Sequence, residues 1–465
     1  MIHGVCDAGA RVRVGAVWRP PPGKRGARLH EALVARPGSC IRRLGGTRAR
    51  EIQFTRFLRN GAVTAAAISR HAGALTAHRV ARREVIAIQD TSELVLGGRR
   101  ARAAGYGVVG KGAALGGLLL HPVLAVEVGT GALLGLVSMQ VWNRADGEVA
   151  PRRKRATVAK ESQRWLDGAQ QAGEVLAQAA SITVVSDRES DFYELFGQRP
   201  ANVQLIVRAC QNRRIEAPAQ DLANGLLFPF IDGLPEQDRF EVTIPAAPGR
   251  KARTAELAVR CAPVTLRKPR HGADPALPAT VAVTLVDVRE TSMPPDAGEP
   301  IHWRLLTTHT AATLVQARRV IDLYRQRWII EEFFRTLKTA GFDIEAADIG
   351  EPQAMINFVA AATIAAVTIK QLVQARDGNT DQRLTDAFDP DDQPILEAVS
   401  VRLAGKTERQ RNPHPKGSLA FAAWVIARLG GWTGYYGKPG PQVMRRGLQE
   451  FRAIKYGTTL GLNDV

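Results

Sequence analysis

Short apolar runs, two of them followed closely by an acidic residue, mark the first half of the chain. Val85–Ile88 is a β-branched run that leads to Asp90, and Ile182–Val185 is a second run that leads to Asp187. Val203–Arg208 is a third apolar run. Runs of this length and composition are typical of buried strands. The pattern therefore predicts three buried strands, two of which end in an acid.

A hairpin, a helix and a β-rich segment are predicted around these strands. Leu118–Val126 and Leu133–Trp142 are apolar runs separated by Gly129–Gly131, which predicts a β-hairpin. Val158–Ala179 has helical spacing. Residues 210–310 hold many prolines and stretches in which polar and apolar residues alternate, so we interpret them as a β-rich module.

Helical spacing dominates the two ends of the chain. Residues 51–81 look helical, whereas residues 1–50 are rich in Arg, Gly, Pro and Ala and have poor periodicity. Leu314–Thr339 is predicted to be one long helix, Ala354–Ala375 a second and residues 442–455 a third. This order of elements predicts an α/β core that is interrupted by a β-rich insertion.

The charge balance of the chain indicates a class of partner. The 465 residues include 63 Lys or Arg and 45 Asp or Glu, which gives a net charge of +18. Residues 1–83 hold 17 of the basic residues but only three acids. A chain this basic usually binds a polyanion, most often nucleic acid, although ribosome-associated and membrane-surface proteins are basic too.

Cysteine usage and hydropathy indicate a cytoplasmic protein. The four cysteines lie far apart, with no CxxC pair, and are interpreted as reduced thiols. No run approaches the roughly 18 apolar residues of a membrane span, and the N-terminus lacks the apolar segment of a secretory signal. We therefore expect no membrane partner.

One stripe of the predicted helix Leu314–Thr339 carries an aromatic residue, an acid and two cations: Tyr324, Arg327, Glu331 and Lys338. At about 100° per residue, their spacing confines them to a stripe roughly 60° wide. Such a stripe is not a normal core face. From spacing alone, however, an exposed helix with i, i+4 pairs such as Arg327–Glu331 explains it better than a site does.

Three acids have the chemistry of a metal site. Asp90 and Asp187 each follow a predicted buried strand, at the rim of a sheet where sites form in α/β folds. Either one alone is better explained as a turn-forming Asp, but the pair together with Glu331 is harder to dismiss. Converging carboxylates hold two Mg²⁺ ions about 4 Å apart in phosphoryl-transfer sites, where the ions activate the attacking oxygen and stabilise the leaving oxygen.

Residues 324–338 resemble a known family signature. They read YRQRWIIEEFFRTLK, which is similar to the Y-(2)-R-(3)-E-(6)-K pattern of DDE transposases of the insertion-sequence-four group. QDTS at residues 89–92 resembles the family's segment with the first catalytic Asp, and VVSDRESD at residues 184–191 resembles the segment with the second. The resemblance covers residues 50–455, to a rough approximation.

The resemblance implies a ribonuclease-H-like core and a set of site residues. It implies three ligands for two Mg²⁺ ions, for which Mn²⁺ would substitute: Asp90, Asp187 and Glu331. It implies three side chains that hold DNA phosphates: Tyr324, Arg327 and Lys338. Flipped bases would stack on Trp303 or Trp328. Packing in the core is an equal alternative for Trp303 and a slightly favoured one for Trp328.

The same resemblance implies a cut-and-paste transposase of an insertion sequence. Family members nick the transposon end, form a hairpin with the freed 3′-OH, reopen it and join the end to target DNA. They act on double-stranded DNA as a homodimer that synapses two ends. Residues 437–451 resemble a C-terminal region that contributes, although they look equally like a basic surface helix. The expected place of work is the bacterial cytoplasm and nucleoid.

Pattern and resemblance together divide the chain into five predicted regions. They are a basic N-terminal region related to a helical end-binding domain (1–80), the first part of the catalytic core (81–209), the β-rich insertion (210–310), the rest of the core with the signature helix (311–375) and a C-terminal helical region with a possible role in dimerisation (376–465).

Residues 1–50 depart from the family, which opens with a compact helical domain that grips the transposon end. They contain only two acids, and we hypothesise that this start is frameshifted or decayed. The alternative is a basic arm that binds DNA by counterion release. Translation of the upstream DNA in the other two reading frames tests the hypothesis, which fails if neither frame gives an amphipathic helix.

Two alternatives to an active transposase stay open for the whole chain. They are an inactive DNA-binding remnant and a structure-selective nuclease.

Overall fold

The computed structural model describes most of the chain. The described residues are 23–35, 38, 40–97, 105–109, 115–144, 161–216, 225–244, 252–271, 273–292, 300–339 and 342–461. Three parts of the sequence analysis lie wholly or partly outside them: residues 1–22 of the N-terminal region, the predicted helix start at residues 158–160, and residues 217–224, 245–251, 272 and 293–299 of the predicted β-rich module.

A mixed sheet forms the centre of the molecule, with 11 strands among the described residues. They are β1 (Glu84–Gln89), β2 (Ser92–Val95), β3 (Val108–Val109), β4 (Leu115–Glu127), β5 (Leu133–Trp142), β6 (Ser181–Ser186), β7 (Val203–Arg208), β8 (Asp238–Ile244), β9 (Arg253–Arg267), β10 (Thr280–Glu290) and β11 (His302–Thr307). The order is β2-β4-β1-β6-β7-β11-β10-β9-β8, with β3 and β5 also paired to β4. The β1–β6 and β6–β7 pairs are parallel.

Helices cover the sheet and form both ends of the described chain. The longer ones are α1 (Gly23–Ala35), α3 (Arg48–Leu58), α4 (Ala65–Ala77), α6 (Gln163–Val175), α9 (Leu314–Arg325), α10 (Trp328–Lys338), α11 (Pro352–Ala375), α12 (Gln393–Leu403), α13 (Leu419–Leu429) and α14 (Pro441–Gly461), and the short ones are α2 (Ile41–Gly45), α7 (Tyr193–Gly197) and α8 (Leu227–Asp232). A central sheet with helices confirms the predicted α/β class.

The predicted strands form where the apolar runs place them, as β1, β6, β7 and the β4–β5 hairpin. The strands of the β-rich segment do not build a separate sheet. β11 pairs with β7, with Leu305 opposite Arg208, and β10, β9 and β8 follow outward in order. Residues 210–310 therefore extend the central sheet away from β1.

Successive residues of β1 enter two different cores. Val85 and Ala87 pack in a core with residues of α6, whereas Ile86 and Ile88 pack in a core with residues of α10 and α11. Side chains alternate between the two faces of a strand. A strand that is apolar at each of these positions is therefore buried on both faces.

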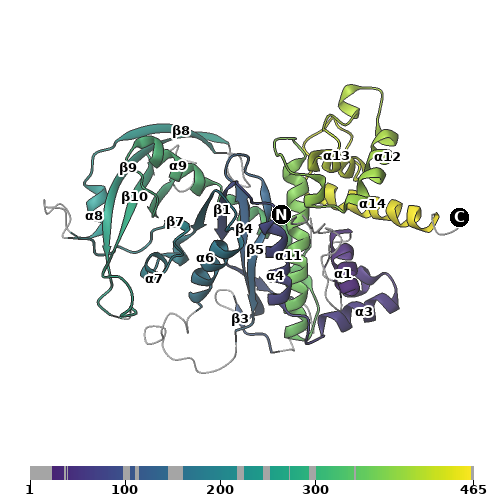
Figure 1. The fold of residues 1–465 in the computed structure, drawn as a ribbon, viewed down its shortest axis with the longest axis horizontal. Coiled ribbons are helices and arrows are strands. Elements are labelled where there is room, and N and C mark those ends of the chain that lie inside the picture. Colours follow the sequence, from purple (N-terminus) through teal and green to yellow (C-terminus); the bar gives the residue numbers. More distant parts are fainter. Residues whose placement is uncertain are drawn as a thin grey trace, which may run out of the picture.

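α11 is the central helix of the molecule. Figure 1 shows it between the sheet on one side and the N-terminal and C-terminal helices on the other, and it contacts β5, α1, α13 and α14. Its length and mean hydropathy would also suit a membrane span, but 83% of its most apolar 18-residue stretch is buried inside the protein. The core therefore explains its apolar character.

The predicted single helix Leu314–Thr339 is wrong, because the structure breaks it into α9 and α10. Gln326 and Arg327 form the junction. There the backbone bonds close tighter turns, with the Arg327 N–H donating to the Tyr324 carbonyl over 3.0 Å and the Ile330 N–H to the Arg327 carbonyl over 3.1 Å. Such i→i−3 bonds are those of a 3₁₀ turn. The 100° spacing therefore does not extend from Tyr324 to Lys338.

The N-terminal region holds helices that the sequence analysis did not predict. α1 and α2 lie before Glu51, and Leu29, Leu33 and Val34 of α1 are fully or almost fully buried. α1 contacts both α11 and α14. Leu29, Leu33 and Val34 keep a helical spacing and bury one face of α1, a pattern that the Arg, Gly and Pro content of residues 1–50 as a whole obscured.

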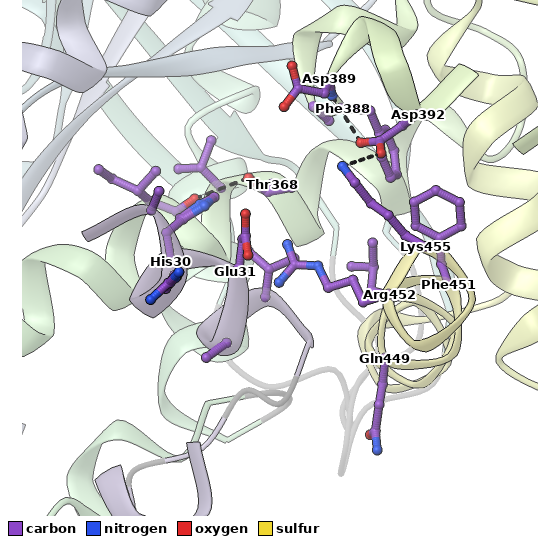
Figure 2. A pocket seen from close by; sticks show the side chains of 18 of the residues that line it. His30, Glu31, Thr368, Phe388, Asp389, Asp392, Gln449, Phe451, Arg452 and Lys455 are labelled. Carbon is purple, nitrogen blue, oxygen red and sulfur yellow. Dashed lines mark hydrogen bonds and ion pairs between the residues drawn. The ribbon is translucent and has the colours of Figure 1, made fainter. Parts of the chain in front are cut away.

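A cavity of about 950 Å³ lies where α1, α11 and α14 meet. Figure 2 shows the side chain of Arg452, from α14, reaching toward Glu31 of α1. Burial lowers the pKa of Arg452 to about 10, although the charges of Glu31 and Asp392 oppose that shift. Lys455 pairs with Asp392 over 2.5 Å. α14 therefore pairs with the segment before α12 and places the charge of Arg452 near Glu31 of α1.

Asn357 offers a test of how α11 holds the N-terminal helices. Its buried side-chain amide donates to the carbonyls of Leu58, over 2.9 Å, and Val63, over 2.8 Å. Asn357→Ala leaves both carbonyls without this donor, so we expect a loss of about 1–3 kcal/mol in the free energy of unfolding. Denaturant unfolding measures it, and Thr368→Ala, whose hydroxyl donates to the Ile364 carbonyl within α11 itself, is the control. Equal stability of the two variants would contradict this role.

Candidate active site

Asp90 and Asp187 follow neighbouring strands of the sheet. β1 ends at Gln89 and β6 ends at Ser186, so each Asp is the next residue along the chain. The two strands are parallel, with Ile88 opposite Val185. Because parallel strands end at the same edge of a sheet, both aspartates lie at one rim.

Arg327 connects this rim to α10. Its Nη1 donates to Oδ2 of Asp90 over 2.9 Å, and its Nη2 donates to Oε1 of Glu331, one helical turn further along. The Arg327 side chain is mostly buried. One guanidinium group therefore holds together two of the three acids that the sequence analysis singled out.

Asp187 joins the group from the β6 side. Its charge acts on both Asp90 and Arg327, and its Oδ1 lies 4.0 Å from Nη1 of Arg208, at the end of β7. This Oδ1 atom is buried and accepts no hydrogen bond from the described residues. Asp90 and Glu331 thus contact Arg327 directly, whereas Asp187 lies near enough for its charge to act on Arg327.

The surroundings of Asp90, Tyr324 and Arg327 shift the pKa values of these three side chains. Burial raises the pKa of Asp90 to about 6, helped by the charges of Asp187 and Glu189 and opposed by Arg327 and the Thr91 N–H. Burial also raises the pKa of Tyr324, and the charge of Asp187 adds to this. For Arg327, burial lowers the pKa but the surrounding negative charges outweigh it, so the guanidinium stays charged.

The other candidate residues on α9, α10 and β11 divide into two groups. Tyr324 is buried beside the acids, with Trp303 edge-on to its ring at 5.7 Å between centroids. Lys338 points elsewhere, because its Nζ donates to the Glu93 carbonyl over 2.5 Å and lies 3.3 Å from Glu345. Among the described contacts, Lys338 touches none of the three acids.

Trp328 is 60% exposed, so the slight preference for core packing is wrong. The buried side of α10 is formed by Ile330, Phe333, Phe334 and Leu337. At about 100° per residue, Trp328 stands roughly 200° from Ile330 and therefore faces away from the core. Trp303, in contrast, packs partly buried against the core.

Residues 182–368 match the family model of the transposase DDE domain. The match begins in β6 and ends in α11, so it includes Asp187 and Glu331 but not Asp90. It supports a DDE transposase, a family that generally uses divalent metal ions and acts on DNA.

Two arginines near the candidate site escaped the sequence analysis. Arg208 reaches Asp187 from the end of β7, and its Nη2 also donates to the His302 carbonyl over 3.0 Å. Arg208 could have been identified from its position, because it is the last residue of the predicted strand Val203–Arg208. Arg164, in the first turn of α6, contacts Thr91 and Glu189, and no sequence motif identifies it.

The residues present fit a divalent cation by their chemistry. Carboxylate oxygens are the ligands that hard cations prefer, and the buried Oδ1 of Asp187 has a free acceptor position. Among the described residues, no three His, Cys, Asp or Glu side chains are grouped closely enough to hold a metal ion together. Arg327, which contacts two of the acids, supplies the positive charge in this arrangement.

The raised pKa of Asp90 predicts a pH dependence of stability in the metal-free protein. The folded state holds this proton more tightly than the unfolded chain, whose ordinary pKa is 3.8. The tighter binding of this proton stabilises the folded state by at most about 3 kcal/mol. This stabilisation is fully present below about pH 4 and is lost as the pH rises through about 6. Denaturant unfolding between these pH values, with a chelator present, should show the loss in the wild type and a flatter profile in Asp90→Asn. Identical profiles would contradict the shift.

Proposed function

We propose that the chain is a transposase of the insertion-sequence-four group, which moves an insertion sequence by cutting and joining DNA at its terminal inverted repeats. The convergence of Asp90, Asp187 and Glu331 from three distant segments carries the proposal. Holding several carboxylates near one another at a half-buried rim is costly unless they are paired, and a purely structural role gives no reason to gather three. Two of them lie within the residues that match the DDE domain.

The three acids would hold two Mg²⁺ ions, with Mn²⁺ as a substitute. Such ions supply Lewis-acid chemistry, activating the attacking water or 3′-OH and stabilising the leaving oxygen of the phosphodiester. Arg327 suits both a carboxylate and a DNA phosphate, because a guanidinium group binds either one through two parallel N–H bonds. Tyr324 and Arg327 would hold the phosphate beside the acids, and Lys338 would hold one further along the strand.

The tryptophans suit the unpaired bases of a DNA end. Trp328 presents an exposed indole at the start of α10, next in sequence to Arg327. Stacking on an aromatic ring contributes about 1–3 kcal/mol per base. Trp303 is the second stacking candidate, and its contact with Tyr324 would link base binding to phosphate binding.

The rest of the fold supports this proposal. Parallel strands β1, β6 and β7 beside antiparallel β4 suit a ribonuclease-H-like core. Exposed arginines on α2 and α3 suit the phosphates of a transposon end: Arg42, Arg43, Arg48, Arg50 and Arg56. α14 would contribute to a homodimer that synapses two ends, and the place of work would be the bacterial cytoplasm and nucleoid.

Glu331 and its neighbour Glu332 give a matched test. Glu331→Ala removes a proposed metal ligand, so we expect Mg²⁺-dependent nicking at a terminal inverted repeat to be abolished while DNA binding is largely kept. Glu332 pairs instead with Lys370 of α11, so Glu332→Ala should still nick. Nicking is measured on labelled DNA that carries the repeats flanking the gene.

The same assay separates the alternatives. Normal nicking by Glu331→Ala contradicts the proposed active site. Binding without cleavage by the wild type indicates an inactive remnant. Cleavage of branched DNA without preference for a terminal repeat indicates a structure-selective nuclease.

A further inference from the structure

Arg164 connects two segments that carry candidate catalytic acids. Its Nε donates to Oγ1 of Thr91 over 2.7 Å, and its Nη2 donates to Oε2 of Glu189 over 2.7 Å. Its Nη1 donates to the Glu161 carbonyl over 2.6 Å. The side chain is only 10% exposed. Each part of the guanidinium group thus has a partner, and two of these partners lie next to the active site.

Both partners are coupled to an aspartate through short local contacts. The Thr91 N–H donates to Oδ1 of Asp90 over 2.8 Å. Glu189 lies in the 3₁₀ turn Arg188–Ser190, which begins with a bond from the Ser190 N–H to the Asp187 carbonyl over 3.1 Å. A shift of Arg164 is therefore transmitted to Asp90 through Thr91 and to Asp187 through the turn.

A buried network fixes the Thr91 hydroxyl. Because Thr91 Oγ1 accepts from Arg164, its own proton is available for Nδ1 of His121, 2.9 Å away. Burial lowers the pKa of His121 well below its ordinary value, so the ring is neutral. Its other nitrogen, Nε2, then donates to Oε1 of Gln89 over 3.2 Å. Gln89 fixes this direction, because its Nε2 donates to the Trp165 carbonyl and its Oε1 is left as the acceptor for His121.

Aromatic rings hold the guanidinium group in place. Its centre lies 5.7 Å from the centroid of Trp142 and 5.3 Å from that of Trp165, within the range of cation–π contacts. His121 packs edge-on against Trp165 at 4.7 Å between centroids. The group is thus fixed by packing as well as by its hydrogen bonds.

We propose that Arg164 is a positioning residue for the transposase reaction: by joining Thr91 to Glu189 it sets the separation of the Asp90 and Asp187 carboxylates, and with it their affinity for divalent cations. This inference rests on the proposed function. Lysine cannot replace the side chain, because one ammonium group lacks the planar fork that reaches three partners at once. Glu189 is 66% exposed, so its ion pair with Arg164 adds little to the stability of the fold. In this proposal the pair instead positions the turn that follows Asp187.

Binding of Mn²⁺ to the full chain tests the proposal, with calorimetry or paramagnetic resonance as the readout. Arg164→Met, Arg164→Lys and Thr91→Val should each bind Mn²⁺ about 10- to 100-fold more weakly at the site that Glu331→Ala removes, as loss of a supporting contact does in metal sites. The nicking rate should approach that of the wild type when the Mn²⁺ concentration is raised in proportion to the loss of Mn²⁺ affinity. The affinity for transposon-end DNA should not change.

Arg253→Met is the matched control. Arg253 is 11% exposed and pairs with Glu290 on the outer strands of the sheet, so its loss should leave Mn²⁺ affinity unchanged. If Arg164→Met fails to fold, Thr91→Val, which keeps the shape of the side chain, decides the question.

The outcomes separate this inference from the function beneath it. Wild-type Mn²⁺ affinity in folded Arg164 and Thr91 variants overturns the role of Arg164 and leaves the transposase proposal standing. A wild-type chain whose Mn²⁺ binding does not depend on Glu331 overturns both.

Discussion

The guanidinium group of Arg327 lies between Asp90 and Glu331, with the charge of Asp187 close by. Burial, aided by the nearby charges of Asp187 and Glu189, disfavours the charged form of Asp90 and raises its pKa to about 6. Like charges held close together at this rim also repel one another. A positive charge at the centre offsets this repulsion. A divalent cation would supply the same charge, so the arrangement suits an active site whose acids stay close together before the metal ions bind.

The fold serves this arrangement through two features. Parallel pairing of β1 with β6 brings two aspartates that are far apart in the sequence to one edge. The junction between α9 and α10 then places Arg327 at the start of a helix that carries Glu331 in its first turn. A continuous helix would follow the 100° spacing and aim these side chains differently. The tight turn at Gln326 and Arg327 is therefore part of the site as well as part of the backbone.

The strand that leads to each aspartate could be predicted from sequence, because β-branched runs mark strands buried on both faces. The signature spacing also led to Glu331 and Arg327. The break at Gln326 could not be predicted, since Tyr324–Lys338 is periodic throughout and contains neither Gly nor Pro. Arg164 and Arg208 act across the sheet, and contacts between distant elements leave no local pattern. α1 could have been predicted from the helical spacing of Leu29, Leu33 and Val34, but the surrounding Arg, Gly and Pro residues obscured it.

Anomalous diffraction from crystals of the protein with Mn²⁺ directly tests whether the three acids hold divalent cations. We expect an anomalous peak of Mn²⁺ between the carboxylates of Asp90, Asp187 and Glu331. The Arg327 side chain should have moved away from Asp90, from Glu331 or from both. A map in which Arg327 still bridges Asp90 and Glu331 at saturating Mn²⁺, with no peak among the three acids, would contradict it.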